Sequence, residues 1–128
     1  GHPEEDARRA FRQGLRTFPL PVHDPQAVEE EVVDMLAWYA SLPEAETWLR
    51  HGTPEQEIVD ASGALYRADL VVNDGEKITV VEYKTGTPTV AHQTQLRGYM
   101  DLLATASALP VQGVLVYLDL KRLERFSP

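Results

Sequence analysis

The apolar residues in the first half of the chain recur every three or four positions, which is the period of a helix that buries one face. The pattern predicts a polar helix over residues 3–16, a longer helix from Pro25 to about Ser41, a short helix over 44–50 and a loop over 51–54. The apolar face of the middle helix consists of Val28, Val32, Met35, Leu36 and Tyr39. We therefore expect this part to be helical, with its middle helix packed on a core.

The pattern changes after residue 55 to short segments rich in Val, Ile and Tyr, which is typical of strands. These segments cover residues 56–61, 64–72 and 77–83. Asp74 and Gly75 lie between the last two segments, and an Asp-Gly pair there is a strong signal for a tight hairpin turn. We therefore expect a three-stranded antiparallel meander in which Asn73 pairs with Glu76.

A second helical pattern covers residues 90–107, and residues 111–118 then form an almost continuous apolar run, as in a strand buried on both faces. The inward face of this helix consists of Leu96, Tyr99, Met100, Leu103 and Ala106. A helix that connects two strands of one sheet lets them run parallel. The expected fold class is α/β, with a mixed sheet flanked by helices and a basic tail over residues 121–125.

The length and composition of the chain fit one small domain of 128 residues. The chain has no cysteine, which limits the kinds of site it can form. Disulfides, cysteine nucleophiles and thiolate-bound iron–sulfur clusters are excluded, and the composition fits a reducing compartment. No apolar run approaches the roughly 18 residues of a membrane helix. We expect a cytoplasmic protein with no membrane partner.

The chain carries 12 basic and 20 acidic residues, a net charge of −8, which at first argues against a nucleic-acid partner. The excess is uneven, however. Residues 1–60 hold 13 acids and 5 bases, whereas residues 61–128 hold 7 of each. The second half is therefore neutral overall, and it contains the candidate chemistry.

Three charged residues of the meander, Asp69, Glu82 and Lys84, should project from one face of the sheet. The expected turn places Asp69 opposite Val80, and a strand returns to the same face at every second residue. Glu82 would then be a diagonal neighbour of Asp69.

Charged groups among valines are costly unless they are paired or hold a cation. Lys84 could form a salt bridge with one carboxylate. Alternatively, Asp69 and Glu82 could bind a hydrated divalent ion while Lys84 orients a water for attack on a phosphate. A second acid-x-Lys match, Asp119 to Lys121, has no second acid a hairpin away, and we interpret it as a solvated strand end.

The segments 66–72 (YRADLVV), 80–86 (VVEYKTG) and 95–99 (QLRGY) resemble the RecB-like branch of the PD-(D/E)xK nuclease superfamily. The closest likeness is to the C-terminal nuclease domain of UvrD/RecB/AddA-type helicase-nucleases. The resemblance covers about residues 55–118. It implies a restriction-endonuclease-like core over residues 55–128, preceded by an N-terminal helical part over residues 1–54, in a domain excised from a larger helicase-nuclease.

The resemblance also implies the role of each site residue. Asp69 and Glu82 would bind Mg²⁺ or Mn²⁺ together with the backbone carbonyl of Tyr83, and Lys84 would position the attacking water. Gln95 and Tyr99 match the QxxxY motif, which supports the site or contacts DNA. Glu57 matches an acid that often completes the metal site, although a solvated strand acid is an equal alternative; core packing is the alternative for Tyr99.

Two departures from the family pattern stand out. Leu70 follows Asp69 where relatives often have arginine, and the metal-binding histidine of an early helix has no clean match among His23, His51 and His92. His92 shares a helix face with Gln95 and Tyr99, but an ordinary surface histidine is the simpler interpretation.

The resemblance implies a metal-dependent DNA exonuclease domain, fed single strands by the helicase motor of its parent chain and acting in DNA repair and recombination. One alternative is a catalytically inactive domain that guides DNA or braces a helicase assembly. Another is a protein-interaction module whose acidic helix, residues 25–41, docks a basic partner.

Overall fold

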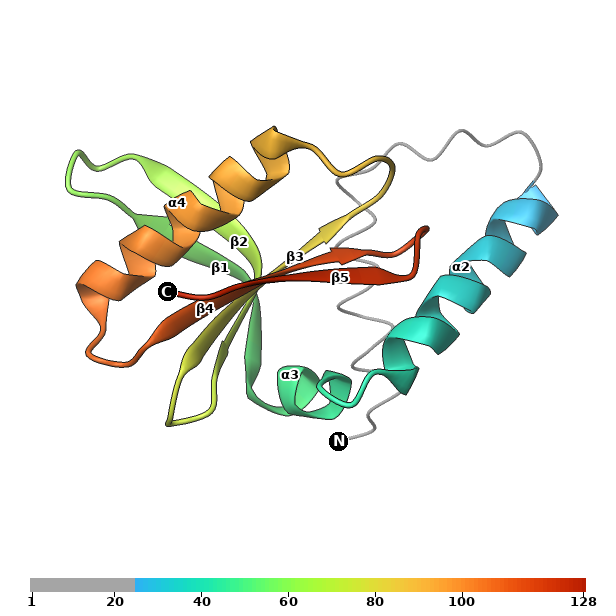
Figure 1. The fold of residues 1–128 in the computed structure, drawn as a ribbon, viewed down its shortest axis with the longest axis horizontal. Helices are drawn as coiled ribbons and strands as arrows, with labels where there is room; N and C mark the ends of the chain where they lie inside the picture. The colour runs from blue at the N-terminus through green and yellow to red at the C-terminus, as the bar shows by residue number, and fades with distance from the viewer. Residues whose placement is uncertain (1–24) are drawn as a thin grey trace.

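The computed structural model describes residues 25–128, in which a five-stranded sheet is covered by helices on both faces (Figure 1). The expected helix over residues 3–16 lies outside the described residues. The elements are α2 (Pro25–Ser41), α3 (Ala45–His51), β1 (Gly52–Val59), β2 (Leu65–Asn73), β3 (Ile78–Lys84), α4 (Val90–Ala106), β4 (Val111–Tyr117) and β5 (Arg122–Phe126). No helix among the described residues is long and apolar enough to cross a membrane.

The sheet has the strand order β1-β2-β3-β4-β5, and its mixed character confirms the expected α/β architecture. The meander β1-β2-β3 is antiparallel, whereas β3 and β4 are parallel because α4 carries the chain back between them. This is the topology expected of a restriction-endonuclease-like fold.

Each face of the sheet has its own apolar core. On one face, Met35 and Tyr39 of α2 and Trp48 of α3 pack on the sheet. On the other face, Leu96 and Met100 of α4 do so. Among the residues expected to face inward, Leu103 is half-buried and packs against this core, whereas Ala106, the last residue of α4, is exposed.

The structure corrects the prediction at both edges of the sheet. The first strand begins at Gly52, so the expected loop over residues 51–54 is largely strand; Pro54 is tolerated there because β1 is an edge strand. The prediction of a basic tail over residues 121–125 is also wrong, because β5 covers most of these residues and pairs antiparallel with β4.

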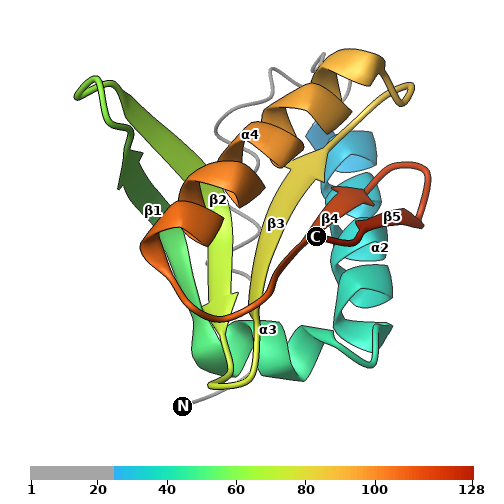
Figure 2. The same cartoon turned by 60° about the vertical axis from the view of Figure 1, so that its left-hand side comes forward.

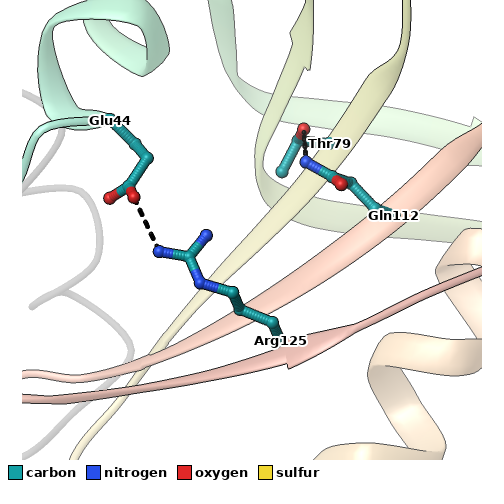
Figure 3. Close-up of polar contacts among 4 residues, drawn as sticks. All are labelled: Glu44, Thr79, Gln112 and Arg125. Carbon is teal, nitrogen blue, oxygen red and sulfur yellow. Dashed lines mark hydrogen bonds and ion pairs between the residues drawn. The ribbon is translucent and has the colours of Figure 1, made fainter.

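The edge strand β5 is anchored by an ion pair that sequence patterning does not reveal. Arg125 donates from Nη2 to Oε1 of Glu44, just before α3, at 2.7 Å (Figure 3). Nearby, Gln112 of β4 donates to Thr79 of β3 at 2.9 Å, across the parallel pair. These contacts lie at the end of the sheet opposite the carboxyl end of β3.

The hairpin register also differs from the prediction. Asn73 pairs with Ile78 rather than Glu76, because Asp74 accepts hydrogen bonds from the backbone of Glu76 and Lys77 and so holds a wider loop. Leu70 consequently pairs with Val81, which places Asp69 opposite Glu82 rather than Val80. Within the paired residues, from Leu70 to Asn73 and from Ile78 to Val81, a displacement of two residues leaves each side chain on its expected face.

Candidate active site

The strands β2 and β3 diverge beyond the Leu70–Val81 pair and form a fork that α4 spans (Figure 2). Side chains replace the strand ladder inside this fork. The backbone N–H of Asp69 donates to Oε1 of Glu82 at 3.1 Å, and the backbone N–H of Tyr83 donates to Oδ2 of Asp69 at 2.9 Å. The two acids therefore hold the mouth of the fork together.

A local irregularity in the β1-β2 pair produces the fork. Pro54 pairs with Leu70 and Gln56 with Ala68, while Glu55 adopts a φ of 51° and lies opposite Asp69. Regular alternation would put Ala68 and Leu70 on the same face. Instead Ala68 belongs to the core under α4 and Leu70 to the core on the other face. The strand thus changes face at Asp69, as at a bulge.

The acids of the fork are withdrawn from water. Glu82 is 3% exposed and Asp69 is half-buried. Burial, reinforced by the charge of Asp69, raises the pKa of Glu82 to about 9. Burial also raises the pKa of Asp69, although the hydrogen bond from the Tyr83 N–H opposes this. A nearby cation would stabilise both ionised carboxylates.

Tyr83, between Glu82 and Lys84, is fixed from the opposite face of the sheet. Its hydroxyl lies 2.7 Å from the hydroxyl of Tyr39 on α2, and the two rings pack edge to face. Because N–H and C=O of an extended residue point to the same side, the Tyr83 carbonyl faces Asp69 as its N–H does. It can therefore add an oxygen donor to the fork.

The sequence left open a salt bridge between Lys84 and one of the two acids, and among the described residues Lys84 forms none. Its ammonium group donates instead to Oε1 of Gln95 at 2.8 Å. Gln95 in turn donates from Nε2 to the Tyr99 hydroxyl at 3.2 Å. The structure therefore links Lys84 to both residues of the QxxxY motif on α4. Tyr99 also packs in the core, being 8% exposed, so its two interpretations are compatible.

Glu57 is not brought to the fork. It pairs with Arg67, at 3.7 Å between Oε1 and Nη2, and both side chains are exposed. Their neighbours along the two strands, Ile58 and Ala68, face α4, so Glu57 and Arg67 point to the other side. The acid of β1 that lies beside Asp69 is Glu55, which sequence alternation missed because a positive φ at a glutamate gives no sequence signal.

His92 lies near Lys84 but contacts a different residue. Its Nδ1 is 3.1 Å from the Tyr117 hydroxyl, and the rings lie 5.8 Å apart. Burial and then the charge of Lys84 lower the pKa of His92, which favours a neutral ring. The histidine therefore supports the start of α4 rather than the carboxylates.

Asp119 is not merely a solvated strand end. Its Oδ2 accepts a hydrogen bond from the N–H of Gly86 at 2.8 Å, and the Leu118 N–H donates to the Lys84 carbonyl at 3.0 Å. Gly86 has a φ of 83°, which suits glycine. These contacts fix the backbone that leaves Lys84.

The fork fits a hard divalent cation by its donor chemistry. Two carboxylates and a backbone carbonyl are oxygen donors of the kind that Mg²⁺ and Mn²⁺ prefer. Within residues 25–128, no cluster of three or more His, Cys, Asp or Glu side chains is placed to hold a metal. An ion held by Asp69 and Glu82 would therefore keep several waters, as Mg²⁺ usually does in proteins.

Three comparisons relate the chain to known proteins. A crystal structure of SSO0001 is similar at a TM-score of 0.40, with 20% identity over 96% of this chain and 75% of that chain, which is too weak to carry an argument. No curated protein matches the chain. The PD-(D/E)XK nuclease superfamily matches over residues 4–127. The acid of β2 and the Glu-x-Lys segment of β3 meet in one fork on an α/β sheet, and with this match over nearly the whole length the chain belongs to the PD-(D/E)XK nuclease superfamily.

Proposed function

We propose that this chain is a deoxyribonuclease domain that uses Mg²⁺ or Mn²⁺ to hydrolyse phosphodiester bonds. The observation that carries the proposal is the pair of acids, buried Glu82 and half-buried Asp69, joined across the fork beside Lys84, which forms no ion pair with a described carboxylate. Membership of a superfamily of generally metal-dependent phosphodiesterases agrees with it. A bound ion would polarise a phosphoryl oxygen and lower the pKa of a coordinated water.

In this proposal the protein groups bind the metal ion, orient the attacking water and neutralise charge on the phosphate. Asp69, Glu82 and the Tyr83 carbonyl hold the ion. Lys84, held by Gln95, keeps its ammonium group where it can orient the attacking water and stabilise charge that develops on the phosphate. The water oxygen attacks phosphorus in line with the departing sugar oxygen, so one P–O bond forms as the other breaks. The water releases one proton to solvent as it attacks, and the departing sugar oxygen takes one up from solvent.

We further propose that the domain is an exonuclease for single-stranded DNA within a RecB-type helicase-nuclease. The QxxxY motif supports this assignment, because the structure connects it directly to Lys84. A tethered motor would supply most of the grip on the DNA backbone, which accounts for a net charge of −8 on the nuclease chain.

Cleavage of a 5′-labelled single-stranded oligonucleotide with Mg²⁺ tests the proposal. We expect Asp69→Ala, Glu82→Ala and Lys84→Ala each to reduce the rate by at least a hundredfold. Matched controls are Glu57→Ala, an exposed strand acid, and Lys121→Ala, the lysine of the second acid-x-Lys match. Circular dichroism verifies that each variant folds. Unchanged cleavage by Glu82→Ala contradicts the proposal.

The alternative of an inactive, DNA-guiding domain has two observations in its favour. Among the described residues, no cluster of three or more His, Cys, Asp or Glu side chains is placed to hold a metal, and Leu70 stands where relatives often have a cation. Calorimetric titration with Mn²⁺ separates the two. Binding that is lost in Asp69→Asn supports the enzyme, whereas no binding by the unaltered chain favours the inactive domain.

A further inference from the structure

A groove of about 440 Å³ lies beside the fork, between β2 and α4, and this volume is within the range of small-molecule sites. Tyr66 of β2 and Tyr99 of α4 form its aromatic part, with ring centroids 6.3 Å apart and planes at 70°. Leu102 adds apolar surface farther along α4. Tyr66 is 39% exposed, so part of an aromatic ring is open to solvent.

The groove is continuous with the proposed catalytic residues. Gln95 lines it and accepts the hydrogen bond from Lys84, while Tyr99 lines it and accepts from Gln95. An occupant of the groove would therefore lie one side chain away from Lys84. A nucleotide whose phosphate lay at the fork would have its base within reach of this groove.

The charges around the groove favour a base over a phosphate. Asp60 and Asp101 line it, and within the described residues no lysine or arginine does. The Ser62 hydroxyl, foremost among its hydrogen bonds, lowers the pKa of Asp60 and keeps it ionised. Carboxylates repel phosphate but accept hydrogen bonds from the amino groups of bases. Asp60 also accepts from the Tyr66 hydroxyl at 3.2 Å, which steadies the ring.

We propose that this groove binds one unstacked nucleobase of the DNA substrate, with Tyr66 as the stacking surface. The inference rests on the proposed nuclease function and deepens it. In a duplex the faces of a base are covered by its neighbours, so only a single strand or a frayed end can offer a base to a tyrosine ring. Tyr66 thereby becomes a residue that determines the preference for single strands, without touching the reacting phosphate.

Gly98 provides a way to close the groove without touching the fork. It lies on α4 and lines the groove, and a Cβ added there would meet nothing within 4 Å. Gly98→Leu should therefore fold well and occupy the space of the base. Ala104→Leu adds a similar side chain at an exposed position on the same helix, outside the groove, and is its matched control.

The test measures DNA binding separately from cleavage. Fluorescence anisotropy of a labelled single-stranded oligonucleotide in EDTA should give a Kd about tenfold weaker for Tyr66→Ala and Gly98→Leu, since both variants remove the stacking of a base on an aromatic ring. Tyr66→Phe and Ala104→Leu should bind like the unaltered chain. An oligonucleotide of abasic sites should bind all variants equally.

The outcomes test the base-binding groove and the nuclease function separately. Equal Kd values for the unaltered chain, Tyr66→Ala and Gly98→Leu overturn the base site, even if the chain cleaves DNA. If the chain cleaves nothing but the two variants still lose binding only to base-containing DNA, the nuclease function fails and the base site stands. If both hold, Tyr66→Ala slows cleavage of ordinary single strands and leaves cleavage of abasic strands unchanged.

Discussion

Asp69 and Glu82 are joined by hydrogen bonds across the mouth of a strand fork. The N–H of Asp69 binds the Glu82 carboxyl group, and the Asp69 carboxylate binds the N–H of the residue after Glu82. The acids thus replace the hydrogen bonds that the ladder loses where β2 leaves β3. The same groups that shape the fork are those proposed to bind metal, so folding and metal affinity are coupled here.

The stability of the metal-free domain should fall as pH rises. Folding raises the pKa of Glu82 from 4.5 to about 9, so between these values the folded chain holds a proton that the unfolded chain has released. The stabilisation from this proton is complete below about pH 4.5 and is lost progressively as pH rises toward 9. Urea unfolding in EDTA at several pH values measures the slope. Glu82→Gln, which cannot ionise, should flatten it; an equal slope in that variant contradicts the prediction.

Metal should restore the stability lost at high pH. Ionised Asp69 and Glu82 bind a cation, whereas the protonated forms do not, so Mn²⁺ should raise Tm more at pH 8 than at pH 5. Thermal unfolding with and without Mn²⁺ measures this difference. Asp69→Asn should abolish the increase at both pH values, and Glu57→Ala should leave it intact.

Asp119→Ala should slow cleavage while leaving metal binding unchanged. The lost acceptor frees the Gly86 N–H and loosens the backbone after Lys84, without altering the carboxylates. We expect kcat to fall about tenfold and the calorimetric affinity for Mn²⁺ to stay within twofold. Asp119→Asn keeps an acceptor oxygen and should recover most of the rate. Loss of Mn²⁺ binding in Asp119→Ala would place this residue in the metal site instead.

The Tyr39–Tyr83 hydroxyl pair should contribute to stability as a unit. Each hydroxyl is buried and has the other as its partner at 2.7 Å, so Tyr39→Phe leaves the Tyr83 hydroxyl unpaired, at a cost of about 1–3 kcal/mol. The double Phe variant removes both hydroxyl groups, so its loss of unfolding free energy should be smaller than the sum of the losses in the two single variants. Urea unfolding of the four proteins measures the coupling; strict additivity contradicts it.

Gly113→Ala should destabilise the core beneath α4. A Cβ at this position in β4 would lie 2.6 Å from the Met100 sulfur and 2.9 Å from Leu96 side-chain carbons, which is closer than such atoms can approach. Overpacking of this kind costs about 1–3 kcal/mol. Chemical unfolding measures the loss. In a Met100→Ala background, Gly113→Ala should cost less than it does in the unaltered chain, whereas Gly98→Ala, where space is open, should be neutral or stabilising.

The sequence by itself determined the order of the main elements and the parallel final pairing, because hydrophobic periodicity and turn residues are local signals. It also indicated that Asp69 and Glu82 lie on neighbouring strands, although the structure brings them together through side chain–backbone hydrogen bonds at a bulge and not through regular alternation. The resemblance linked Gln95 and Tyr99 to the same site, and a spacing of four along a helix placed them on one face.

Tertiary structure decided everything that depends on a partner distant in sequence. The strand at Arg122–Phe126 forms because β4 offers an open edge and Glu44 binds Arg125, and neither fact is visible in a short basic segment. Glu55 lies beside Asp69, and Glu57 points away from the fork. Both placements follow from the positive φ of Glu55, which inverts the alternation of side chains along β1. Whether Lys84 binds a carboxylate or Gln95 is likewise settled only by packing, because the choice depends on how α4 crosses the fork.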